Sequence, residues 1–149
     1  MEFKKNKMHF SKSILIIFVA LIMISIVFVN NFNISYGNVS PEAIEVSITD
    51  LIDNPQEYSG KLVRVHGVCR LQFEEDALYS SADDYKNHIS ANAIWLSLND
   101  NGRQTFTYFL LKKASGRCVL VEGVFSKWNT GHWGAYPGAI TQITRFQSL

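Results

Sequence analysis

The chain has 149 residues, of which 47% are hydrophobic and 18% are charged, and its formal net charge is +1. The apolar residues are unevenly distributed, because the run from Ile14 to Val29 is interrupted only by Ala20 and Ser25. The stretch from Asn38 to Leu149 has a length that suits one domain. This length excludes a large multidomain enzyme.

Residues 1–37 carry a basic start, an apolar run and then small polar residues, which is the order found in export signals. Basic side chains stay on the cytoplasmic side while the apolar run enters the membrane. We therefore expect the rest of the chain on the far side of the cytoplasmic membrane, periplasmic or extracellular. The basic residues before or at the start of the run are Lys4, Lys5, Lys7 and Lys12.

The fate of this segment is open between two outcomes. Ser35 and Gly37 are small residues two positions apart, as in a signal-peptide cleavage site that would release the domain after Gly37. Alternatively, the run from Ile14 to Val29 is retained as a membrane anchor, with the C-terminal domain outside. The run is short for a full span and long for the apolar part of a signal peptide.

The charge of the domain differs from that of the whole chain. Residues 38–149 hold ten basic and twelve acidic residues, a net charge of −2. Nucleic-acid binding depends on Lys and Arg neutralising phosphates, so this partner is disfavoured.

The first predicted elements after a linker over residues 38–46 are a short helix and a strand. Ser47 is a helix cap, with Asp50 three residues on, and Asn54-Pro55 ends the helix. From Gly60 to Val68, β-branched residues alternate with polar ones, which predicts a half-buried strand.

The same pattern recurs later in the chain, from Gly116 to Val124. Gly, a basic residue, Val, Val, Gly and Val fall in the same register, so we expect equivalent structural roles. The late glycines, Gly67 and Gly123, are predicted to mark a bulge or sharp bend.

Further elements complete a β-rich pattern. Ser81 begins a segment able to cap a helical turn before Asn87. The remaining predictions are a strand at Ala93–Leu98, a turn at Asn101-Gly102, a returning strand or short helix at Thr105–Leu111, and a last strand at Ala139–Phe146. Five or six short strands with little helix indicate a small all-β barrel or sandwich.

The two glycine-bounded segments, Gly60–Val68 and Gly116–Phe125, resemble the first and fourth strands of an OB-fold. This resemblance implies a five- to six-stranded barrel over residues 38–149, preceded by a short helix. A second set of short motifs is similar to a group of bacterial exported or membrane-anchored proteins, which implies no particular activity. These motifs are Phe73-Glu74, Leu78-Tyr79, Asn92–Leu96, Gly131-His132 and Gly138–Ile140.

The segment from Lys127 to Gly138 is the first candidate site. It combines Trp128, His132, Trp133 and Tyr136 with three glycines between two predicted strands. In an OB-like barrel this connection borders the usual ligand face, where rings stack on sugars, bases or apolar side chains. The alternative is that these rings fold back and plug the barrel mouth.

The acidic segment from Phe73 to His88 is the second candidate. Its carboxylates and His88 match no metal-ligand spacing, so a solvated loop is favoured over a metal site. Glu74 is the exception in this segment, because it lies beside Phe73 at a strand end, where partial burial is expected. A triad of Ser80 or Ser81 with His132 and an Asp is selected by nothing in the sequence.

The cysteines and the absence of catalytic motifs complete the analysis. Cys69 and Cys118 could form a disulfide outside the cytoplasm, although their side-chain parities on the two strands differ. The chain lacks a nucleophile elbow and a phosphate-binding loop, and we expect no cofactor and no metal.

These observations favour a non-catalytic binding module of the cell envelope. A protein or glycan would be met by one barrel face and the Trp128–Tyr136 loop, with the ligand-binding set Phe73, Glu74, Tyr79, Trp95, Trp128, His132, Trp133 and Tyr136. One alternative is a small envelope hydrolase or metal-dependent enzyme that uses Glu74, His132 and the Asp83/Asp84 loop. Another is an OB domain that binds single-stranded nucleic acid.

Overall fold

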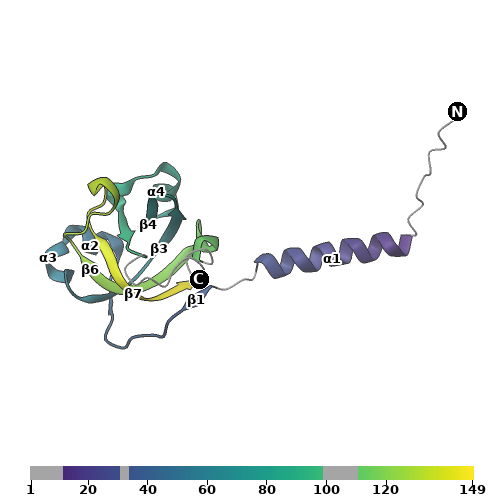
Figure 1. The fold of residues 1–149 in the computed structure, drawn as a ribbon, viewed down its shortest axis with the longest axis horizontal. Coiled ribbons are helices and arrows are strands. Elements are labelled where there is room, and N and C mark those ends of the chain that lie inside the picture. Colours follow the sequence, from purple (N-terminus) through teal and green to yellow (C-terminus); the bar gives the residue numbers. More distant parts are fainter. Residues whose placement is uncertain (1–11, 31–33, 99–110) are drawn as a thin grey trace. The chain divides into compact units, whose positions relative to one another are not determined.

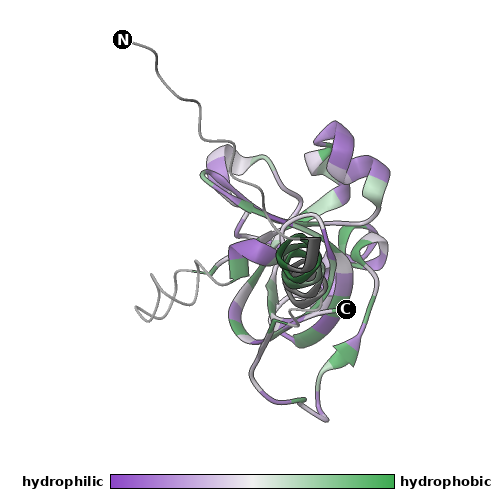
Figure 2. Ribbon diagram, turned by 90° about the vertical axis from the view of Figure 1, so that its right-hand side faces the viewer, coloured by the Kyte–Doolittle hydropathy of each residue, from purple (hydrophilic) through white to green (hydrophobic). Residues whose placement is uncertain are grey.

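The computed structural model describes residues 12–30, 34–98 and 111–149, and the chain divides into two compact units at Phe32 and Asn33. The first unit contains helix α1 (Lys12–Asn30), whose residues are mostly hydrophobic, as the colouring in Figure 2 also shows. In the described part of the chain, no helix is both long enough and apolar enough to cross a membrane.

The second unit is mostly β-structure, with seven strands in one sheet and a few short helices (Figure 1). The fold class expected from the sequence is confirmed at this level. The strands are β1 (Ser35–Tyr36), β2 (Ile44–Glu45), β3 (Leu62–Gln72), β4 (Glu75–Tyr79), β5 (Ala93–Leu96), β6 (Cys118–Ser126) and β7 (Ala139–Ser148). The helical segments are α2 (Ile48–Asp53), α3 (Pro55–Tyr58), α4 (Ala82–Asn87), η1 (Ser90–Asn92), η2 (Lys112–Ala114) and η3 (His132–Gly134).

Strand pairing is mainly antiparallel. Strand β3 pairs with β4 and β6, β4 also pairs with β5, and β6 also pairs with β7. Strands β5 and β7 are parallel. Hydrogen-bonded pairing therefore runs from β3 through β4, β5, β7 and β6 back to β3. The two short strands add to this set, β1 beside β7 and β2 beside β3.

The two glycine-bounded segments of the sequence pair with each other. Strands β3 and β6 are antiparallel, with Val65 opposite Val121, and both residues are fully buried. The alternation of apolar and polar residues thus sends one row of valines into the core, as predicted.

The late glycines of the two segments have different roles. Gly123 lies where the β6–β7 register shifts, and a Cβ there would be 2.5 Å from Ile140 Cγ2, so the predicted irregularity is confirmed. Gly67 pairs regularly with Val119. Its added Cβ would be 2.6 Å from the Tyr79 carbonyl oxygen, so the glycine is required by close packing and no bulge is found at this position.

Both predicted helix caps are present. The Ser47 hydroxyl accepts a hydrogen bond from the Asp50 N–H at 3.0 Å, and Ser81 does the same for Asp84 in α4. Pro55 follows α2 as predicted, but it also begins α3, because proline suits the first position of a helix.

Two segments predicted as loops are partly strands. Glu75–Tyr79 in the acidic segment forms β4, and Asp76 within it is buried. Ile44–Glu45 in the predicted linker forms β2. The turn at Asn101-Gly102 and residues 105–110 of the predicted returning strand lie outside the described residues.

A buried charge cluster fastens the segment before β2 to the sheet. We call Ser40, Arg64, Glu122 and Arg145 the Glu122 network. Glu122 is fully buried, with one carboxylate oxygen 2.7 Å from Arg64 Nε and 3.1 Å from Arg145 Nη1. Its other oxygen accepts the Ser40 N–H at 3.0 Å, and Arg64 Nη2 donates to the Ser40 carbonyl at 2.7 Å. Residues before β2 are therefore part of the domain.

Candidate functional site

The β3–β4 turn and the loop from 127 to 138 approach each other through Glu74 and His132. Glu74 Oε2 lies 3.7 Å from His132 Nε2, which forms an ion pair when the imidazole is protonated. Phe73 precedes Glu74 and Trp133 follows His132 in the chain. We call these four residues the Phe73–Trp133 surface.

The turn holds Glu74 in an unusual backbone conformation. Phe73 and Glu74 join the paired residues Gln72 and Glu75, so the hairpin loop has two residues. Glu74 has φ 62°, a region that favours glycine or asparagine. This conformation is held by the strands on either side, and it places a half-exposed glutamate side chain at the tip of the hairpin.

The 127–138 loop is held by hydrogen bonds and close packing. Gly131 N–H donates to the Asn129 side chain at 3.1 Å, and Tyr136 N–H donates to the Thr130 carbonyl at 3.1 Å. A Cβ on Gly131 would lie 2.7 Å from the Trp95 ring, so the loop backbone packs directly on that ring. Trp133, in η3, has φ 57°, again in the left-handed region. The conformation of the loop is therefore specified locally.

The aromatic side chains predicted as one ligand-binding set fall into two groups. Phe73, Trp128 and Trp133 are 84%, 81% and 90% exposed, whereas Tyr136 is 7% exposed and Tyr79 is 1% exposed. The alternative in which the loop rings fold back therefore applies to Tyr136 and not to the two tryptophans.

The buried rings belong to a second small apolar cluster, on the face of β4 and β5 opposite to the main core. Ala77, Tyr79, Ala93 and Tyr136 form it, with Tyr85 and Trp95 packed against them. Trp95 and Tyr136 have ring centroids 5.4 Å apart. The loop and α4 thus cover this face of the strands, and Tyr79 and Tyr136 are packed as core residues.

Burial also raises the pKa values of Tyr79 and Tyr136. Burial raises the pKa of Tyr79, and its hydrogen bond to Glu75 at 2.6 Å raises the pKa further. Burial is likewise the main cause of the raised pKa of Tyr136. Both phenols are therefore neutral hydrogen-bonding groups at neutral pH.

Glu75, next to the turn, is surrounded by donors. Its oxygens contact Tyr79 OH, Gln72 Nε2 at 2.6 Å, Arg70 Nε at 3.1 Å and His88 Nδ1 at 3.2 Å. Burial raises the pKa of Glu75, but the hydrogen bonds from Tyr79 and Gln72 and the charge of Arg70 outweigh it and hold the pKa below its usual value. Glu75 therefore stabilises the β3–β4 turn through its contacts with Gln72, Arg70, Tyr79 and His88.

The other acidic residues of the segment serve local structure. Asp84 accepts hydrogen bonds from Ser80 and Ser81, the two candidate nucleophiles, and from Asn92. The bonds from Ser81, Asn92 and Ser80 lower the pKa of Asp84. Asp83 is exposed and lies 3.7 Å from Lys86. Within residues 12–30, 34–98 and 111–149, no group of three His, Cys, Asp or Glu side chains is placed to hold a metal ion.

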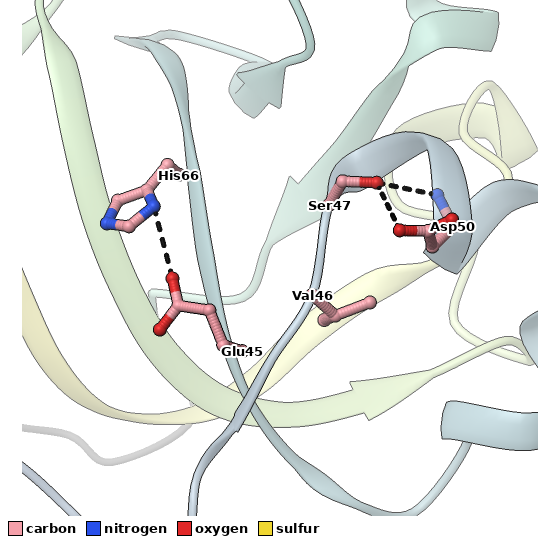
Figure 3. Close-up of a pocket in the computed structure, with 5 residues that line it drawn as sticks. All are labelled: Glu45, Val46, Ser47, Asp50 and His66. Atoms are coloured by element: carbon pink, nitrogen blue, oxygen red, sulfur yellow. Dashed lines mark hydrogen bonds and ion pairs between the residues drawn. The ribbon is translucent and has the colours of Figure 1, made fainter.

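A pocket of about 300 Å³ lies away from these residues, between β2, β3 and the start of α2 (Figure 3). Glu45 and His66 point toward each other across it, with His66 Nδ1 3.3 Å from Glu45 Oε1. Ser47 and Asp50 are joined by the helix cap. The polar side chains that line the pocket therefore contact one another, and none of the predicted site residues lines the pocket.

The two cysteines are free, so the disulfide that the sequence left open is absent. Cys118 lies opposite Val68, so Cys69 faces the other side of the sheet. Cys69 is buried and donates to the Ala114 carbonyl at 2.9 Å, and burial raises the pKa of its thiol to about 12. Cys118 is exposed.

Two charged residues that make buried or half-buried ionic contacts, Arg70 and Glu122, were not identified from the sequence. Arg70 stacks over the Tyr85 ring at 4.0 Å and contacts Glu75 and His88. Glu122 is the second case. Each is a charged residue inside an apolar strand pattern, which is the signal that could have identified a buried ionic contact.

Compared with protein-family models, curated proteins and solved structures, the chain gives no match.

Proposed function

We propose that this protein is a non-catalytic binding module of the cell envelope, exported or tethered to the membrane through Ile14–Val29, and built on an OB-like barrel. A partner protein or glycan binds at the Phe73–Trp133 surface. The carrying observation is the Glu74–His132 contact, which brings together two loops that each present an almost fully exposed aromatic ring.

The strand pairing supports the barrel. Five strands pair in a ring in the order β3, β4, β5, β7, β6, and β3 and β6 are the two segments that resemble the first and fourth OB strands. The β3–β4 turn and the β6–β7 loop then border the same end of the β4–β5 face, and in OB-folds these two connections and this face take the ligand. Because Tyr136 and α4 cover the face itself, the proposed site lies on the two connections.

The N-terminal residues support export. Four lysines and one glutamate come before or at the start of the apolar run, and this unit is separate from the domain. Either retention or removal of the run places the domain outside the cytoplasm.

Exposure of the rings supports binding. Phe73 and Trp133 expose 84% and 90% of their surface, so these two rings contribute little to the packing of the domain. Aromatic residues of this kind supply large contact areas with few rotatable bonds. Tyr136, in the same loop, is buried in the second cluster and anchors the loop.

The test is a thermal-melting screen of the full chain in nonionic detergent against peptides, neutral oligosaccharides, divalent cations and oligonucleotides. A ligand at about 100 times its dissociation constant stabilises the folded state by about 2.7 kcal/mol. The shift should be lost in Phe73→Ala and Trp133→Ala and kept in Trp128→Ala, a matched loss of an exposed ring. A shift that survives in all three variants places the ligand elsewhere and contradicts the proposal.

A second candidate is a small envelope hydrolase or metal-dependent enzyme, and the same Glu74–His132 contact favours it. A carboxylate and an imidazole 3.7 Å apart are the groups of a general acid–base pair. This candidate requires that the protein turn over an ester, glycoside or peptide model substrate, with or without added Zn²⁺. The turnover should be abolished in Glu74→Gln and in His132→Gln. Turnover unchanged in both variants would exclude it.

A further inference from the structure

Glu74 differs from Glu75 and Glu122 in the residues that its carboxylate contacts. Glu75 and Glu122 each contact arginine, Glu75 through Arg70 and Glu122 through Arg64 and Arg145. Among the described residues, Glu74 has no ion pair with a lysine or arginine, and its one ionic contact is with His132 at 3.7 Å. Its side chain is 54% exposed and is therefore accessible to a positive group from outside the chain.

Among the residues that the structure describes, no lysine or arginine lies over either of the two exposed rings. In the same loop, Lys127 Nζ lies 4.4 Å from the Trp128 ring centroid, and nearby Arg70 lies 4.0 Å from that of Tyr85. For Trp133, the described residues supply an edge contact with His132 at 5.3 Å and no lysine or arginine over the ring. A ring face attracts cations, and tryptophan does so most strongly.

The backbone beneath the surface is also held in a defined conformation. Trp133 lies between Gly131 and Gly134, which have φ 66° and 71°, and the Gly131 backbone packs on Trp95. The two-residue turn holds the Glu74 backbone. Little backbone freedom is therefore lost when a ligand binds to such a surface.

We infer that the Phe73–Trp133 surface binds a lysine or arginine side chain of a partner protein, with Glu74 neutralising the charge and the Trp133 and Phe73 rings contacting it. This inference rests on the proposed function and names the partner class. The net charge of −2 on residues 38–149 also favours a basic partner. A sugar hydroxyl can donate to Glu74 but leaves its charge uncompensated.

The probe is an N-acetylated, C-amidated peptide Gly-Gly-Arg-Gly-Gly, compared with the same peptide carrying citrulline in place of arginine. Citrulline keeps the shape of the side chain and removes its charge. The indole N–H signals of Trp133 and Trp128 are followed by NMR in the ¹⁵N-labelled full chain in nonionic detergent. The arginine peptide should shift the Trp133 signal, and the citrulline peptide should bind at least about threefold more weakly.

Two pairs of variants separate the surface from general charge and ring effects. Glu74→Gln should weaken binding of the arginine peptide about threefold, whereas Glu57→Gln, an equal change of charge on α3, should not. Trp133→Ala, in which binding is followed through the backbone N–H signal of Glu74 because the indole signal is lost, should weaken it by a similar factor, and Trp128→Ala should not. Added salt should weaken binding to the parent chain.

Equal binding of the arginine and citrulline peptides, or binding unchanged in Glu74→Gln, overturns the inference. A Trp133 shift caused by chitotetraose and not by the arginine peptide also overturns it, but leaves the proposed binding function in place. When no peptide or glycan shifts either Trp133 or the melting temperature, the inference and the proposed function both fail.

Discussion

The Glu122 network and the Phe73–Trp133 surface each contain a glutamate, yet the fold treats the two carboxylates in opposite ways. Glu122 is fully buried and contacts two arginines and a backbone N–H. Glu74 is 54% exposed and contacts one histidine at 3.7 Å. A buried charge must be compensated inside the molecule, whereas an exposed charge is solvated by water and remains available to a partner. The first region therefore holds the fold together, and the second is available for recognition.

The largest effect should come from removing the buried carboxylate. Glu122→Ala removes the carboxylate shared by Arg64 Nε and Arg145 Nη1, leaves Arg64 with its exposed ion pair to Glu45, and releases the Ser40 N–H. Breaking a buried ionic contact in this way typically costs about 3–5 kcal/mol. Urea unfolding should reveal this loss, while Glu74→Ala should change the free energy of unfolding by no more than about 0.5 kcal/mol.

Equal effects of the two substitutions would remove the distinction between the regions. A large loss in Glu74→Ala would mean that Glu74 is a structural residue, and its proposed role in binding would lose its basis.

The next largest effect concerns the segment that the Glu122 network fastens. Ile34 is 6% exposed, its N–H donates to Ser148 Oγ at 2.9 Å, and its carbonyl accepts the Ser148 N–H at 2.8 Å. A chain starting at Asn38 lacks Ile34 and β1, and should be less stable than one starting at Asn33 by about 2–5 kcal/mol, the usual cost of removing a buried isoleucine. Chemical denaturation of the two chains measures the difference.

Equal stability of the two chains would show that residues 33–37 add nothing to the domain. Signal-peptide cleavage after Gly37 would then leave the fold intact. With the expected difference, cleavage at that bond would remove part of the core, and retention of the segment is favoured.

Periodicity in the sequence predicted the long strands and failed for the short ones. Val63 and Val65 alternate with polar residues, which indicates β3, and the same glycine-bounded spacing recurs around Val119 and Val121, which indicates β6. Strands β1 and β2 have two residues each, which is too short for any pattern. Strand β4 was predicted as a solvated loop because Glu75 and Asp76 are acidic, and the compensating Arg70 lies on another strand.

The candidate surface was predicted in composition but not in arrangement. The sequence singled out Phe73, Glu74, His132 and Trp133, but the contact between Glu74 and His132 joins residues that lie far apart along the chain. Within the loop, Trp133 and Tyr136 are both aromatic, and an irregular backbone has no period that separates exposed from buried positions. Only the packing of Tyr136 on the second cluster distinguishes them.

A smaller effect is expected from acid. Burial raises the pKa of Glu122, but the hydrogen bonds from Arg64, the Ser40 N–H and Arg145 outweigh it and hold the pKa below its ordinary value of 4.5. A carboxyl of this kind contributes its full stability above the unfolded pKa and loses it as the pH falls through the folded pKa. The free energy of unfolding should therefore decrease below about pH 4.5, and Glu122→Gln should show a weaker dependence.

Glu75 and Asp84 also have lowered pKa values, so part of the acid dependence should persist in Glu122→Gln. Urea unfolding at several pH values below neutrality measures both slopes. Identical slopes in the parent chain and Glu122→Gln would contradict the assignment of acid lability to this network.

The smallest effect on stability should come from the residue with the largest proposed effect on binding. Trp133 is 90% exposed, so Trp133→Ala removes almost no buried surface and should change the free energy of unfolding by no more than about 0.5 kcal/mol. Tyr136→Ala, three residues away, empties a position that is 7% exposed and should cost about 3 kcal/mol or more. Thermal and urea unfolding of the two variants measure this contrast. A loss of about 3 kcal/mol in Trp133→Ala would mean that the ring packs against the domain in solution, and the surface would then be structural like the Glu122 network. A stable Trp133→Ala chain that no longer binds its ligand would place stability and recognition on different residues of one short loop.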